Sequence, residues 1–128
     1  MTYSSRKVSS WIGILLAFGI ALGASPLYAD VTLKAYLDLR QTPEIREKLR
    51  TYFTGVGRGI FYSNAALYIR GAQRLFCVPE DLALDEGIIQ ALLGQEIRGP
   101  GEGRSYEGDT SVELILLNAF IYRFPCGR

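Results

Sequence analysis

The chain has 128 residues, room for one domain, and its 48% hydrophobic content argues against an intrinsically disordered protein. The formal net charge is +1, and it becomes −1 without residues 1–29, so the chain lacks the basic footprint of a nucleic-acid-binding protein. Histidine is absent, which removes the usual general base and the commonest transition-metal ligand, and we expect neither an enzyme nor a cofactor.

Residues 1–29 have the three parts of a secretory signal peptide: a basic start, an apolar run from Trp11 to Ala24, and small residues near a cleavage point. We expect cleavage near Ala29, and cleavage after Gly23 is the alternative. An uncleaved anchor is disfavoured because a membrane-spanning helix needs roughly 20 apolar residues and this run is shorter. We therefore expect a signal-peptide helix over 1–29 and a periplasmic domain over 30–128, which meets the membrane only through this segment during export.

Two helices are predicted at the start of the mature domain. Val31 to Leu39 fits a short helix, because no partner follows that would favour a strand. Thr42-Pro43-Glu44 has a cap residue, a proline suited to the first helical position and an acid that suits the helix dipole. A helix should therefore run from this point to about Ser63 or beyond. Its apolar residues recur at helical spacing: Ile45, Leu49, Tyr52, Phe53, Val56, Ile60 and Phe61.

Three glycines interrupt this helix: Gly55, Gly57 and Gly59. Each costs about 1 kcal/mol relative to alanine. A phosphate-binding loop would need a preceding strand and a third glycine at the right spacing. Gly55, Gly59 and Ser63 lie four residues apart, so we expect this line to be a small-residue face that another helix approaches closely.

The next helix is expected to begin at Asp85, which can cap it, with Glu86 placed favourably for the helix dipole. Together with Glu80 and Asp81 these residues form a group of four carboxylates, for which a metal site or an acid/base pair is the alternative interpretation. The helix should end before Gly99-Pro100. Its apolar face consists of Ile88, Ile89, Leu92, Leu93 and Ile97.

The glycine-rich stretch Gly99–Gly108 is predicted to be a loop. Arginine and tyrosine often anchor protein interfaces, and both occur at its polar tip. The candidate partner-binding residues are therefore Arg104, Ser105, Tyr106 and Glu107. A solvated connector is the alternative.

The last helix is expected to begin with a capping box, because Thr110 and Glu113 have the required spacing. It should end at Phe124-Pro125 and be the most buried helix. One face carries Val112, Ile115, Leu116, Ala119, Phe120 and Arg123, and Leu114, Leu117 and Ile121 widen its apolar surface. The predicted fold is all-α, a small four-helix-type domain.

The only two cysteines are Cys77 and Cys126. An oxidising compartment favours a disulfide between them, which would tie the end of the last helix to the middle of the chain. For a separation of 49 residues the loop-entropy relation gives about 4 kcal/mol. Two buried free cysteines are the alternative, and the absence of C-x-x-C argues against a redox pair.

From about Tyr52 to Cys126 the chain resembles the Rap/Tai family of type VI secretion immunity proteins. The resemblance rests on the order and spacing of four motifs behind a signal peptide: Tyr52-Phe53-Thr54-Gly55-Val56-Gly57-Arg58-Gly59, Leu75-Phe76-Cys77-Val78-Pro79-Glu80, Leu82-Ala83-Leu84-Asp85, and Phe124-Pro125-Cys126. It implies a small helical periplasmic protein that binds and inhibits a secreted cell-wall amidase effector. Some members act as dimers, so a homodimer is a further expectation.

Two other functions are compatible with the residues. The first is a small disulfide-bonded periplasmic chaperone or stress protein that exposes apolar surface in acid. The second is an enzyme, whose best candidate site would be the carboxylate group of Glu80, Asp81, Asp85 and Glu86.

Overall fold

The computed structural model of the protein describes residues 30–101 and 103–127. Within these ranges the regular elements are four helices and no strand, which confirms the predicted all-α fold. The helices are α2 (Leu33–Leu39), α3 (Pro43–Ile69), α4 (Glu86–Arg98) and α5 (Val112–Arg123). The predicted signal peptide, residues 1–29, lies outside the described residues.

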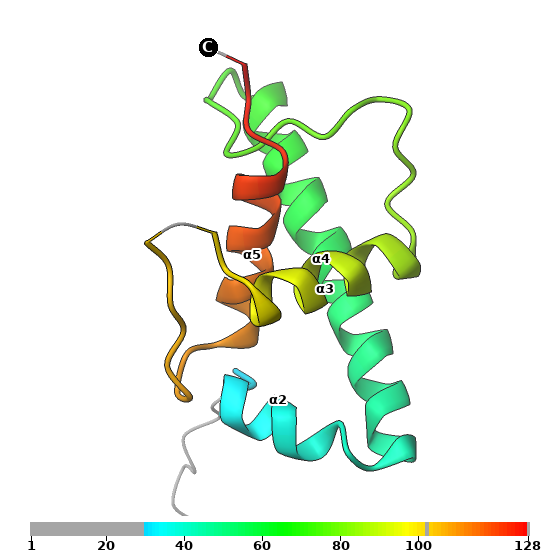
Figure 1. Ribbon diagram of the computed structural model, residues 1–128. Coiled ribbons are helices and arrows are strands. Elements are labelled where there is room, and N and C mark those ends of the chain that lie inside the picture. Colours follow the sequence, from blue (N-terminus) through cyan, green and yellow to red (C-terminus); the bar gives the residue numbers. More distant parts are fainter. Residues whose placement is uncertain (1–29, 102, 128) are drawn as a thin grey trace, which may run out of the picture.

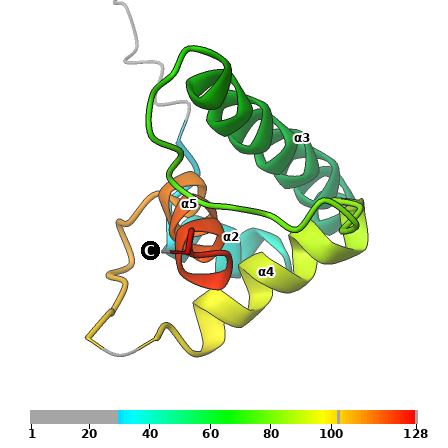
Figure 2. The ribbon, with the colours of Figure 1, turned by 90° about the horizontal axis from the view of Figure 1, so that it is seen from above.

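The helices are arranged around α5. Helix α3 is the long element of the fold, α2 lies near its first turns, and α4 crosses it (Figure 1). Seen from above, α3 and α4 form two sides of an angle, and α5 lies within it (Figure 2). The last helix is therefore enclosed by the others, as its apolar sequence predicts.

The core confirms this central place of α5. Its side chains Val112, Ile115, Leu116 and Phe120 have no exposed surface, and Ala119 is 3% exposed. They meet fully buried residues from α3, from the segment before α4, and from α4: Phe53, Phe76, Ile89 and Leu93. Leu114, which was predicted to widen the apolar surface, is instead 49% exposed, because it lies on the opposite side of α5 from this core.

Two predicted helix starts are confirmed. Pro43 opens α3 after Thr42, although the Thr42 side chain makes no capping hydrogen bond. Asp85 caps α4, since its Oδ1 accepts a hydrogen bond of 2.9 Å from the backbone N–H of Ile88. At the other end of α4, Gly99 follows the last helical residue, as expected.

The predicted capping box of α5 is wrong by one residue. Ser111, not Thr110, is the N-cap, and its hydroxyl accepts from the N–H of Leu114. The physical reason is tertiary: the Thr110 carbonyl accepts a bond of 2.8 Å from the N–H of Leu33, and Thr32 forms an antiparallel bridge with Ser111. Glu113 accepts bonds at Oε1 from Tyr52 Oη (2.9 Å) and the Val31 N–H (3.3 Å), and at Oε2 from the Ser111 hydroxyl (2.7 Å).

The predicted small-residue face of α3 is also wrong. A Cβ placed at Gly55 or Gly59 would have nothing within 4 Å, and both residues are exposed, as is Ser63. The close approach occurs at buried Gly57, where a Cβ would lie 2.7 Å from Cγ2 of Ile89. Helix α4 therefore packs against Gly57, the glycine that is not part of the four-residue spacing of Gly55, Gly59 and Ser63.

The segment 70–85 returns from the end of α3 to the start of α4. Gly71, with φ 72°, adopts the left-handed conformation that closes α3. Buried Asn64 then fixes the segment, because its Oδ1 accepts from the Leu75 N–H (2.7 Å) and its Nδ2 donates to the Phe76 carbonyl (2.8 Å). The segment passes over the end of α5 (Figure 2).

The predicted disulfide between Cys77 and Cys126 is confirmed, with a Cα–Cα distance of 4.8 Å. A backbone hydrogen bond of 2.8 Å from the Cys77 N–H to the Phe124 carbonyl lies beside it. The Phe76 ring stacks on Phe120 with centroids 5.0 Å apart. Covalent, polar and aromatic contacts thus join the chain end to the segment before α4.

Candidate functional site

The segment between α4 and α5 is held against the two helices by a buried carboxylate. Glu96, on α4, is only 8% exposed and accepts hydrogen bonds from Arg104 Nε (2.9 Å), Arg104 Nη2 (3.2 Å) and Tyr106 Oη (2.7 Å). Asn118 of α5 lies next to Tyr106, with its Nδ2 3.4 Å from the hydroxyl. We call Glu96, Arg104, Tyr106 and Asn118 the Glu96 clamp.

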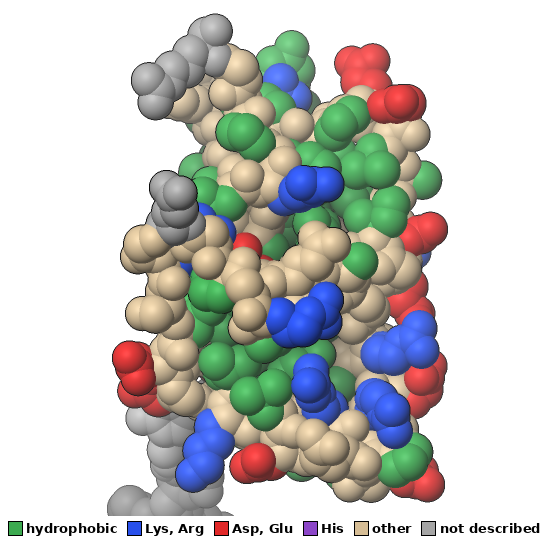
Figure 3. Space-filling view, viewed as in Figure 1, with side chains coloured by type: hydrophobic (Ala, Val, Ile, Leu, Met, Phe, Trp, Pro, Cys, Tyr) green, Lys and Arg blue, Asp and Glu red, His purple; other side chains and the backbone are tan. Residues whose placement is uncertain are grey.

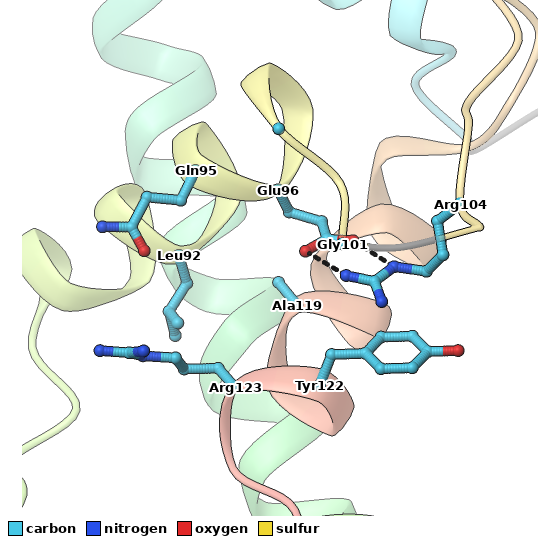
Figure 4. A pocket seen from close by; sticks show the side chains of 9 residues that line it. Leu92, Gln95, Glu96, Gly101, Arg104, Ala119, Tyr122 and Arg123 are labelled. Carbon is cyan, nitrogen blue, oxygen red and sulfur yellow. Dashed lines mark hydrogen bonds and ion pairs between the residues drawn. The ribbon is translucent and has the colours of Figure 1, made fainter.

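The guanidinium of Arg104 is held on a second side by an aromatic ring. Its Cζ lies 3.5 Å from the centroid of the Tyr122 ring, a cation–π contact with α5 (Figure 4). A Cβ at Gly101 would lie 2.7 Å from Nη2 of Arg104, so the loop backbone passes directly over this group. Gly103, with φ 74°, makes the turn that allows it. The close approach at Gly101 and the positive φ at Gly103 therefore explain why both positions are glycine.

The electrostatics of the Glu96 clamp keep its donors protonated. Burial, followed by the hydrogen bond to Glu96, raises the pKa of Tyr106. The hydrogen bond to Glu96 also raises the pKa of Arg104. Both groups therefore stay hydrogen-bond donors at ordinary pH, and the loop remains attached to α4.

A groove runs beside the clamped loop on one face of the molecule. A cleft of about 200 Å³ lies between α4, the loop and α5, and its lining includes Glu96, Arg104 and Tyr122. A second hollow of about 400 Å³ continues along α4 and shares three residues with the first: Leu92, Gln95 and Arg123. We call the two together the front groove.

The front groove changes character along its length. Its far end is lined mainly by apolar side chains: Pro79, Leu82, Ile88, Ala91, Leu92 and Phe124. Its near end is polar and carries Arg123, Gln95 and the Glu96–Arg104 pair (Figure 4). Hydrophobic side chains gather around the hollow above α4 in the space-filling view (Figure 3). The groove can therefore accept a surface that is apolar at one end and hydrogen-bonding at the other.

The four candidate partner-binding residues divide into two pairs. Arg104 and Tyr106 are half-buried and point into the clamp, whereas Ser105 and Glu107 are exposed. From Arg104 to Glu107 the side chains therefore alternate between the half-buried and the exposed side of the loop. The first pair thus holds the loop, and the second pair is available to another molecule.

Sequence reasoning missed Glu96. A signal existed, because a carboxylate stands there among Leu92, Leu93 and Ile97 on the apolar face of a helix. Charged residues are rarely buried unless they are paired, so an acid in that position indicates a cation or hydroxyl donor elsewhere in the chain.

The group of four carboxylates near the start of α4 is dispersed by the fold. Asp85 caps the helix, and Glu86 forms an ion pair with Arg50 of α3. Within residues 30–101 and 103–127, no three histidine, cysteine, aspartate or glutamate residues are grouped so that they could hold a metal ion. Among the helices of the same ranges, none has the length and apolar character needed to cross a membrane.

No protein-family model, curated protein or solved structure matches the chain. The functional proposal therefore rests on the motifs given in the sequence analysis, together with the chemistry of the clamped loop and the front groove.

Proposed function

We propose that the protein is an exported immunity protein that binds and inhibits a type VI secreted peptidoglycan amidase, as its resemblance to the Rap/Tai family implies. The observation that supports this best is the Glu96 clamp, which fixes an exposed loop at the rim of the front groove.

A clamped loop suits an inhibitor for an energetic reason. Ordering a flexible loop on binding costs conformational entropy, and a loop already held in place avoids most of that cost. Arg104 and Tyr106 donate hydrogen bonds to Glu96, so the loop is ordered before a partner binds. Ser105 and Glu107 then meet the partner in a fixed position.

The surroundings of the loop add the residue types that protein interfaces favour. Tyr122 is 54% exposed next to the loop, and Arg123 lines both parts of the front groove. Aromatic and arginine side chains carry much of the binding energy in known interfaces. Inhibition would follow if the loop entered the amidase cleft and the groove covered its rim, because the peptidoglycan peptide could then no longer reach the catalytic residues.

The test is binding to a secreted cell-wall amidase, sought first among the products of the neighbouring genes. We expect the purified protein to bind the amidase and abolish its hydrolysis of peptidoglycan, and we expect cells that produce the protein to survive periplasmic production of the enzyme. Glu107→Lys should weaken the binding, and Asp38→Lys, a charge reversal at an exposed position of α2 outside the front groove, is the matched control.

Glu96→Gln tests the role of the clamp separately. It should speed hydrogen exchange and proteolysis in the loop. It should also raise the Kd for the amidase, although it changes no residue proposed to contact the amidase. If the loop of the Glu96→Gln variant exchanges faster but the variant still binds and inhibits the amidase fully, the role of the clamp is contradicted. Absence of binding and of protection by the unaltered protein would reject the proposed function.

An exposed apolar surface favours a second candidate, the small periplasmic chaperone. Around the end of α3, four large side chains are more than half exposed: Tyr62, Tyr68, Ile69 and Leu75. Such a surface can bind unfolded clients. Suppression of client aggregation at low pH but not at neutral pH would support this function, and an amidase would then show no binding.

A further inference from the structure

A separate hollow, distinct from both parts of the front groove, lies on the other side of α4 on the face shown in Figure 3. It measures about 430 Å³ and is lined by residues of α2, α3 and α4 and of the turn between α2 and α3: Tyr36, Arg40, Gln41, Arg46, Leu49, Arg50 and Gln90. Several Lys and Arg side chains gather in this lower part of the face (Figure 3). We call this concavity the arginine hollow.

The charges of the arginine hollow are only partly compensated. Three guanidinium groups line it and no carboxylate does. Arg50 is paired with Glu47 and Glu86. Within the part of the chain that the structure describes, Arg40 and Arg46 form no ion pair. The hollow therefore presents two uncompensated cations, which focus a positive potential in a concave site.

The walls of the hollow are ordered by contacts that leave these two cations accessible. Arg40 Cζ lies 5.7 Å from the centroid of the Tyr36 ring, and Tyr36 packs edge-on against buried Phe53 at 5.5 Å. Gln90 Nε2 donates a bond of 3.0 Å to the Arg50 carbonyl, which ties α4 to α3 at the edge of the hollow. Tyr36 and Gln90 are thus held against α3, and Arg40 lies beside the ring of Tyr36.

We propose that the arginine hollow binds the phosphate group of a phosphorylated organic molecule. The planar fork of a guanidinium matches phosphate oxygens, and a dianion with three terminal oxygens can accept from more than one guanidinium in a hollow that Arg40 and Arg46 both line. The volume of the hollow exceeds that of a single phosphate, and the side chains of Tyr36 and Leu49 supply an apolar surface for the attached group. The site lies apart from the Glu96 clamp and goes beyond the proposed amidase inhibition.

The same phosphate could belong to a soluble ester or to a lipid headgroup, so the experiment has two arms. In the first, the full protein is titrated with sn-glycerol 3-phosphate at constant ionic strength, and backbone and arginine Nε signals are followed by NMR. In the second, sedimentation is measured with phosphatidylcholine vesicles that contain or lack phosphatidylglycerol. Glycerol and chloride serve as reference ligands.

We expect saturable shifts confined to residues around the arginine hollow, or sedimentation that requires phosphatidylglycerol. Arg40→Gln and Arg46→Gln should each weaken the binding by about 1.5- to 5-fold, the range for exposed charge pairs. Arg58→Gln, an exposed cation of α3 outside the hollow, is the matched control and should leave the binding unchanged.

Two results would overturn the proposal. One is that shifts with the phosphate ester grow without saturation and match those with chloride, while no vesicle is bound. The other is that Arg58→Gln weakens the binding as much as Arg40→Gln and Arg46→Gln, which would show attraction to overall charge and not to this site. Because Arg40 and Arg46 are exposed, their replacement is compatible with folding, and unchanged amide spectra of the variants would verify it.

Discussion

One substitution made at three places in α3 tests the packing of this helix. Alanine replaces glycine at Gly55, Gly57 and Gly59, which lie within five residues of one another in the same helix. Alanine is favoured over glycine inside a helix by about 1 kcal/mol. At Gly55 and Gly59 the added methyl group meets nothing within 4 Å, so the two variants should be stabilised by about 0.5–1 kcal/mol each.

Gly57 should respond in the opposite direction. Its methyl group would lie 2.7 Å from Cγ2 and 3.1 Å from Cδ1 of Ile89, which has no exposed surface and is enclosed by the core. Forcing an extra carbon into a packed core costs about 1–3 kcal/mol. After subtraction of the gain in helix propensity, Gly57→Ala should lower the free energy of unfolding by about 1 kcal/mol.

Urea denaturation followed by circular dichroism measures these differences, provided that the slope m is unchanged. In a thermal scan of a domain this size, 1 kcal/mol corresponds to about 4–8 °C in Tm. Ile89→Ala removes all three carbons that the new methyl group would meet, Cγ1, Cγ2 and Cδ1. The double variant should therefore be more stable than the sum of the two single changes predicts, by about 1 kcal/mol or more.

Equal stabilisation at all three glycines would refute the close approach of α4 at Gly57. Destabilisation at Gly55 and Gly59 would refute a different point, namely that this side of α3 is uncovered in solution. A double variant whose loss equals the sum of the single losses would mean that Gly57 and Ile89 do not share the same space.

Three further outcomes can be measured with the same methods. Replacing both Cys77 and Cys126 by serine should lower the free energy of unfolding by about 4 kcal/mol, and reductant should then have no further effect on the melting curve. Asn64→Ala should cost about 2–3 kcal/mol, because it leaves the buried Phe76 carbonyl without its donor, and it should speed hydrogen exchange at Leu75, whose N–H loses its acceptor; unchanged exchange there would contradict the role of Asn64. Since the pKa of Tyr106 is raised in the folded state, its contribution to stability is complete below the unfolded pKa of about 10 and is lost as the pH rises through the folded value. Tyr106→Phe should therefore melt with a shallower decline of Tm above pH 10, and a decline identical to that of the unaltered protein would exclude this tyrosine as its source.

Local chemistry explains what the sequence could predict. Proline favours the first position of a helix, aspartate before an apolar run favours the N-cap, and glycine is common directly after the last helical residue. Pro43, Asp85 and Gly99 accordingly mark helix ends in the structure. The apolar period of α5 likewise revealed which side of the helix is buried. The disulfide followed because the chain has only two cysteines.

The features that sequence reasoning missed depend on neighbours far along the chain. Ser111 caps α5 because residues 31–33 pair with the segment before that helix, and Thr110 is used in that pairing. Gly57 is the close contact because Ile89 of another helix faces it. The Glu96 clamp requires a loop that folds back by ten residues, which no periodicity records. In each case the local sequence offers several residues that could play the same role. Contacts with distant parts of the chain decide which of them does.

Two links join early parts of the described chain to residues that flank α5. The backbone at Thr32 pairs with Ser111, just before this helix, and Cys77 is bonded to Cys126, just after it. Because a ribosome releases a chain with its N-terminus first, the first link can close only after Ser111 has been made and the second only after Cys126. The early helices therefore wait for α5 before these contacts can hold them together.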